Sequence, residues 1–132
     1  MDIQVELSRI IINEESDQQL IMLKEIDGTR SIPIVIGIVE IFAIDRRIKG
    51  VEPLRPMTHD LLNTVIKKLD AKIDRVLIND LHENTFFARL FLRTKENKEI
   101  EIDCRPSDAI ALSAAQNSPI WVAEHVLNKA GQ

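Results

Sequence analysis

The chain has 132 residues, 45% of them hydrophobic and 29% charged, and its formal net charge is −4. This length suits one domain with its own core, so we expect residues 1–132 to fold as a single unit, and the lone Cys104 excludes an internal disulfide. Because no apolar run approaches about 18 residues and no signal-peptide pattern is present, the sequence predicts a cytoplasmic protein without a membrane partner.

The first third of the sequence predicts paired β-strands. Apolar and polar residues alternate over residues 3–7, and two further strand-like runs, residues 20–26 and 31–36, flank Asp27 and Gly28. Because Asp-Gly between two such runs is a strong hairpin signal, these runs are expected to pair antiparallel.

Two helices and a stiff connector are expected next. Apolar residues recur at helical spacing over residues 38–49, and Gly50 is expected to end that helix. Prolines predict an irregular connector over residues 51–56, since proline lacks an amide donor and restricts its predecessor. Thr58 is the expected N-cap of the second helix. The apolar stripe of that helix consists of Leu61, Leu62, Val65, Ile66 and Leu69.

The second half predicts a strand meander followed by a helix, a short strand and a final helix. The predicted strands cover residues 72–81, 85–93, 98–104 and 120–122. Pro106 should open a helix that reaches residue 116 and is buried against the sheet, because it is apolar or small on nearly all sides. The final helix is expected at residues 123–129. Strands with segregated helices predict an α+β fold, with a mainly antiparallel sheet and three to four helices.

Positive charge is concentrated in the middle of the chain. From Arg46 to Arg75 there are eight basic and four acidic residues, so this segment is +4 and the remainder is −8. Such asymmetry can leave a basic face on an acidic protein, which would suit a nucleic-acid partner. The alternative interpretation is that these residues form only the solvated faces of surface helices.

A first group of polar residues lies where the connector meets the second helix. Arg55 and the helix start could together hold a phosphate, and the His59 imidazole can exchange protons near neutral pH. The alternative is that Thr58 and Asp60 only cap the helix while His59 is a surface residue.

A second group lies at the junction between the last meander strand and the following helix. Alternation along the strand places Cys104 on the core face, as a packed thiol rather than a nucleophile. Asp103 and Asp108 are hard oxygen donors suited to Mg²⁺ or Mn²⁺, and Arg105 between them could hold a phosphate. Capping by Ser107 and Asp108 is the alternative explanation.

Glu40 is a third candidate, because it is the only charged residue between Ile32 and Ile44. A carboxylate in such apolar surroundings is either stabilised near a helix start or part of a buried polar site.

Four segments carry a family resemblance when they are taken together. They are residues 32–37 with Glu40, residues 55–62, residues 103–112 and residues 119–122. In this order they resemble the bifunctional nuclease family, over residues 5–127. The resemblance implies an α+β domain, often oligomeric, in a family named for activity on both RNA and DNA.

The resemblance and the chemistry together predict a metal-assisted nuclease with RNA or DNA as substrate. The expected catalytic residues are His59, Asp60, Asp108 and Glu40. The expected phosphate-binding residues are Arg55, Arg105 and Ser107. The expected ligands of a divalent metal, Mg²⁺ or Mn²⁺, are Asp103 and Asp108.

Two other functions stay open at this point. The same polar residues could serve a non-catalytic oligomeric module, or the basic middle could serve a regulator that binds nucleic acid without cleaving it. The strand over residues 86–92 is apolar on both faces, with Phe87 and Phe91 on one of them. Because neither face should be wet, we expect a homo-oligomer, a dimer.

Overall fold

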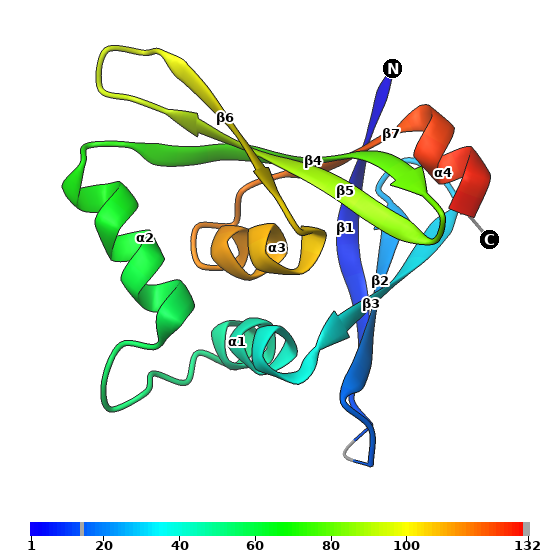
Figure 1. Cartoon of the computed structure of the whole chain (residues 1–132), viewed down its shortest axis with the longest axis horizontal. Coiled ribbons are helices and arrows are strands. Elements are labelled where there is room, and N and C mark those ends of the chain that lie inside the picture. Colours follow the sequence, from blue (N-terminus) through cyan, green and yellow to red (C-terminus); the bar gives the residue numbers. More distant parts are fainter. Residues whose placement is uncertain (14, 131–132) are drawn as a thin grey trace.

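The computed structural model describes residues 1–13 and 15–130, which form one α+β domain with a seven-stranded sheet in the order β3-β2-β1-β7-β4-β5-β6 (Figure 1). The strands are β1 (Asp2–Ile11), β2 (Gln18–Glu25), β3 (Ser31–Gly37), β4 (Lys72–His82), β5 (Thr85–Arg93), β6 (Glu99–Cys104) and β7 (Ile120–Ala123). The helices are α1 (Ile38–Lys49), α2 (Thr58–Lys68), α3 (Pro106–Ala114) and α4 (Glu124–Ala130). The predicted fold class is therefore confirmed.

The sheet consists of two antiparallel meanders joined by the short strand β7. The first meander is β1 to β3 and the second is β4 to β6. Strand β7 pairs antiparallel with β1 and parallel with β4, which is the single parallel pairing among the described strands. The chain passes from β6 through α3 before it reaches β7. Strand β7 lies parallel to β4, and parallel strands are joined by crossover connections rather than by tight turns.

The hairpin predicted around Gly28 is confirmed, but its loop is longer than a two-residue turn. Strand β2 ends at Glu25 and β3 begins at Ser31. The loop is closed by Glu25, which accepts hydrogen bonds from the backbone N–H of Arg30 at 2.9 Å and from its guanidinium at 2.8 and 3.0 Å. The ion pair between Glu25 and Arg30 thus closes a loop that is longer than the two-residue turn expected from Asp-Gly.

Helix α2 begins differently from the prediction. Its N-cap is Met57 rather than Thr58, because Asp60 reaches back to accept the Met57 N–H at 2.9 Å and the Thr58 hydroxyl is not needed. Capping by Asp60 is therefore confirmed, whereas capping by Thr58 was wrong. Helix α1 ends as predicted at Gly50, whose φ of 70° is the left-handed conformation that glycine favours.

Helix α3 is buried, as predicted, and lies between α1 and the sheet (Figure 1). It ends at Ala114, two residues before the predicted end, and neither Ser107 nor Asp108 caps it, because the Arg105 cap makes no side-chain hydrogen bond and Asp108 has other partners.

The predicted apolar stripe of α2 is mostly exposed. Only Ile66 of its members is buried, whereas Leu61, Val65 and Leu69 are 59%, 43% and 73% exposed. Helix α2 stands at the edge of the domain and packs against α3 through one side only (Figure 1).

Strand β5 is covered by parts of its own chain. Helix α3 packs on one face, and on the other face the Arg75 guanidinium lies 3.8 Å from the centre of the Phe91 ring. Phe87, on the same side as Phe91, is 41% exposed. Among the described residues, no helix is long and apolar enough to cross a membrane.

We predict that Glu25→Gln lowers the melting temperature near neutral pH, because it removes the ion pair that closes the β2–β3 loop. Hydrogen bonds from the Arg30 side chain and backbone lower the pKa of Glu25 from 4.5 to about 2. A lowered pKa in the folded state stabilises the protein above the ordinary pKa and is lost as the pH falls toward 2. The difference from the parent should therefore shrink below pH 4.5.

Thermal unfolding followed by circular dichroism over this pH range measures the effect. Glu96→Gln, at an exposed turn position, is the matched control and should behave like the parent. A Glu25→Gln difference that does not change with pH would contradict the prediction.

Candidate functional site

A charged cluster joins α1, α2 and α3. Arg105 Nη2 lies 2.8 Å from Glu40 Oε1 and 2.7 Å from Asp108 Oδ2, and His59 Nε2 lies 3.1 Å from Asp108 Oδ1. We call Glu40, His59, Arg105 and Asp108 the His59 cluster. Four of the residues predicted from the sequence thus meet in space, although they are up to 68 positions apart in the chain.

Local backbone features place each member of the cluster. Glu40 is in the first turn of α1, where the helix dipole favours a carboxylate, and it is buried. Gly37 leaves room for it, because a Cβ there would stand 2.5 Å from Glu40 Oε2. Arg105 is extended before Pro106, as proline requires of its predecessor, so its side chain leaves the start of α3.

The His59 cluster lies at one side of a hollow of about 600 Å³ whose other walls are mostly apolar, apart from Thr58 and Asp103. The apolar side chains of this His59 hollow come from α1, α2, α3, β5 and β6 and include Val39, Leu62, Ile66, Leu90, Leu92, Ile102, Ala109 and Leu112. His59 is buried, which makes the interpretation of His59 as a surface residue wrong. The hollow therefore combines a shielded imidazole with an apolar wall.

The Arg105 guanidinium is the exposed cation of the cluster. Its side chain is 68% exposed, whereas Glu40 beneath it is nearly enclosed at 10%. The hydrogen bond to Asp108 raises the pKa of Arg105 above its ordinary value, so it stays charged. With His59 neutral, the two carboxylates and one guanidinium give the cluster a formal charge of −1.

The contact with Asp108 suits one arrangement of the His59 proton, because a carboxylate accepts hydrogen bonds. When the Nε2–H donates to Asp108, Nδ1 has no hydrogen-bond partner among the described residues and can accept a proton. A carboxylate that holds one ring nitrogen also orients the imidazole. The pair can therefore act as a general base.

Asp60 lies outside the cluster, on the other side of α2. It receives hydrogen bonds from Arg46 at 3.1 Å and Arg47 at 2.7 Å in addition to the Met57 N–H. Burial raises the pKa of Asp60, but the hydrogen bonds from Met57 and Arg47 outweigh it and lower the pKa below its usual range. Asp60 is thus an ionised link between the connector, α1 and α2.

Three further predicted residues are also separate from the cluster's ion pairs. Asp103 lines the His59 hollow, but its side chain is 69% exposed and pairs with Arg89 at 3.3 Å. Ser107 is buried and lines a different hollow, and Arg55 is an exposed residue of the connector. Within residues 1–13 and 15–130, no hydrogen bond joins these side chains to His59 or Asp108.

Cys104 lines the His59 hollow as an unreactive thiol. Burial, followed by the nearby charges of Asp103 and Asp108, raises its pKa from 9.0 to about 11. It packs against the core, which confirms the prediction of a packed thiol.

The predicted metal ligands supply suitable oxygen donors but are not assembled as a cage. Asp103 is engaged by Arg89, and Asp108 by Arg105 and His59. In the part of the chain that the structure describes, no three His, Cys, Asp or Glu side chains are grouped to hold a cation. The metal therefore stays a prediction.

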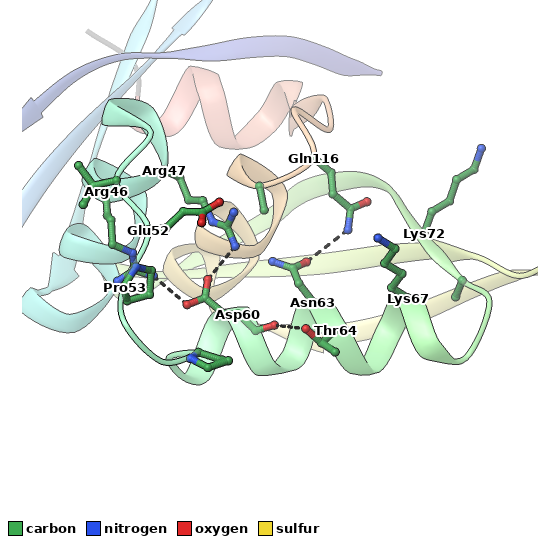
Figure 2. Close-up of a pocket in the computed structure, with 14 residues that line it drawn as sticks. Arg46, Arg47, Glu52, Pro53, Asp60, Asn63, Thr64, Lys67, Lys72 and Gln116 are labelled. Carbon is green, nitrogen blue, oxygen red and sulfur yellow. Dashed lines mark hydrogen bonds and ion pairs between the residues drawn. The ribbon is translucent and has the colours of Figure 1, made fainter.

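A second hollow, of about 550 Å³, was not predicted as a site (Figure 2). It lies on the Asp60 side of α2, and its polar lining includes Arg46, Arg47, Asn63, Lys67, Lys72 and Gln116. The basic middle of the sequence indicated its charge, but only the folded connector brings α1 beside α2. We call this hollow the basic groove.

The fold and the charged cluster define a small α+β domain with a buried imidazole beside an exposed guanidinium. The chain belongs to the bifunctional nuclease domain family, whose family model matches residues 21–132.

Comparisons with curated proteins agree with this assignment. An uncharacterized protein of Mycobacterium tuberculosis is 38% identical over 128 residues, which cover 97% of this chain and 76% of that protein. Bifunctional nuclease 2 of Oryza sativa is 30% identical over 84% of this chain, and bifunctional nuclease 1 of Arabidopsis thaliana is 27% identical over 80%. The matched regions cover 35% and 34% of those two plant proteins.

Proposed function

We propose that this protein is a nuclease that hydrolyses phosphodiester bonds of RNA, DNA or both, with the His59 hollow as its active site. The observation that carries the proposal is the contact of 3.1 Å between His59 and Asp108 beside the exposed Arg105. Membership of the family and the names of the plant relatives support the same activity.

Hydrolysis of a phosphodiester requires a proton acceptor for water and positive charge at the non-bridging oxygens. The water oxygen bonds to phosphorus while the P–O bond to the leaving oxygen breaks. His59 accepts the proton of the attacking water at Nδ1, Asp108 stabilises the imidazolium that forms, and the leaving oxygen takes a proton from solvent. Arg105 holds the phosphate through the side of the guanidinium that faces solvent. Glu40 is a positioning residue, since it holds Arg105 from beneath at 2.8 Å.

A divalent metal ion is the second part of the proposal. The cluster has a formal charge of −1 and the substrate adds another negative charge, so Arg105 alone does not neutralise the site. Mg²⁺ and Mn²⁺ favour oxygen donors, and Mg²⁺ is often held by one or two carboxylates together with substrate phosphates. Asp108 and Asp103 would hold the ion, which would supply Lewis-acid polarisation of the phosphoryl group.

We expect Asp108→Asn and His59→Ala to remain folded but to lose about tenfold or more of the nuclease activity, comparable to the loss of a metal-shell interaction. The assay is cleavage of labelled RNA and DNA by highly purified protein, with melting temperatures measured in parallel. Both variants should melt close to the parent.

The chain offers a matched control in its second His–Asp contact. His125 Nε2 lies 3.4 Å from Asp80 Oδ1 on the exposed surface of α4 and β4. His125→Ala and Asp80→Asn should keep full activity. If the two cluster variants are folded and as active as these controls, the activity does not reside in the cluster.

That outcome would favour the alternative of a non-catalytic module. The observation in its favour is that both oxygens of Asp108 already have partners, so the cluster also works as a tie between helices. A protein of this kind would bind an anionic ligand without cleaving it.

Chelation tests the metal separately. We expect excess EDTA to abolish cleavage of both RNA and DNA, and added Mg²⁺ or Mn²⁺ to restore it. Undiminished cleavage in EDTA would remove the metal from the mechanism while leaving the roles of His59 and Arg105 intact.

We further propose a homodimer through the outward face of α2. Leu61, Val65 and Leu69 form an exposed row at a spacing of four residues, and the same row on a second copy can pack against it about a two-fold axis. Light scattering at micromolar concentration should give twice the chain mass of 15.1 kDa, and Val65→Asp should halve it. Val35→Asp, at an exposed position of β3, should not. A measured mass of one chain for the parent protein would contradict this interface.

A further inference from the structure

We propose that the basic groove is a second binding site, which holds the backbone phosphates of a nucleic-acid strand while the His59 hollow acts on one phosphodiester. This inference rests on the proposed function only in taking nucleic acid as the ligand. The groove lies between the end of α1, the proline connector, α2 and the turn after α3 (Figure 2).

The two hollows differ in charge. The groove is lined by four Lys and Arg side chains against Glu52 and Asp60, a surplus of two positive charges. The His59 cluster has a formal charge of −1. Because clefts focus the field of the charges that line them, a polyanion is attracted to the groove first.

The cations of the groove fall into two pairs. At one end, Arg46 and Arg47 are fixed by Asp60, as Figure 2 shows. At the other end, Lys67 lies in the last turn of α2 and Lys72 is the first residue of β4. Both are exposed, and neither has an ion pair with any described residue. The lysines are therefore the cations with free donors for a phosphate.

Two side-chain amides lie between these pairs. Gln116 Nε2 donates to Asn63 Oδ1 at 3.3 Å, and Gln116 Oε1 accepts the backbone N–H of Ile73 at 3.2 Å. The amide pair is thus held in place by β4. None of the described residues that line the groove is aromatic, so it suits phosphates rather than stacked bases.

Helix α2 forms a wall of both hollows. His59, Leu62 and Ile66 line the His59 hollow. Asp60, Asn63 and Lys67, which are offset by one residue along the helix, line the groove. A strand held in the groove is therefore one helix width from the proposed active site. Contacts of this kind read charge and not sequence, so RNA and DNA should bind alike.

The test uses the double variant Lys67→Gln/Lys72→Gln of the full chain. Binding of fluorescently labelled single-stranded RNA and DNA is measured by anisotropy over a range of salt, in a His59→Ala background and in excess EDTA, which together prevent cleavage. We expect Kd to rise about tenfold at low salt. The negative slope of log K against log salt should become smaller in magnitude by about 1.4, since each single-strand phosphate contact contributes about 0.7.

Lys95→Gln/Lys98→Gln is the matched control, because it removes the same charge from exposed positions at the β5–β6 turn. It should leave both Kd and the salt slope near the values of the His59→Ala background. Equally weakened binding in the two double variants, or unchanged binding in Lys67→Gln/Lys72→Gln, would overturn the proposal that the basic groove binds nucleic acid.

Cleavage assays separate this inference from the proposed function. In the active parent background, Lys67→Gln/Lys72→Gln should raise KM and leave kcat nearly unchanged. If the parent cleaves nothing but binding still depends on both lysines, the groove stands and the nuclease proposal fails. If the parent cleaves and the variant binds and cleaves as the parent does, the nuclease proposal stands and the groove fails.

Discussion

The carboxylate of Asp108 is the contact on which the arrangement of the site depends. One of its oxygens accepts from Arg105, which also reaches Glu40 of α1, and the other meets His59 of α2. Partly buried charges are costly unless they are paired, so each of these groups needs the others to remain where it is. The chemistry of the site and the contacts between the helices therefore involve the same residues.

Local sequence signals predicted most of the fold because those signals are physical and short in range. The bounds of α1 and β5 match the prediction, since helical periodicity, Gly50 and strand alternation decide them. The surroundings of α2 could not be read in this way. Its apolar stripe matched a core-facing helix, but in the folded domain Leu61 and Leu69 are exposed and His59 is buried.

The candidate site was predictable in part for the same reason. Charged residues at the joints between elements identified the cluster, because Glu40 and Arg105 have no role in an apolar core. Which carboxylate meets which cation depends on the path of the chain between them. Asp60 thus pairs with Arg46 and Arg47, whereas His59, one position before it, faces the other hollow. The two lysines of the groove come from α2 and β4.

Strand β7 has a consequence for the order in which the chain can fold. The two meanders can each close through neighbours in sequence, but β7 lies between β1 and β4 and comes from residues 120–123. The two meanders can therefore be joined into one sheet only after β7 is available. This joining closes a long loop, which is a slow step. During synthesis on the ribosome, both hollows would remain unformed until almost all of this domain has emerged, so the nascent chain would carry the groups of the site without its geometry.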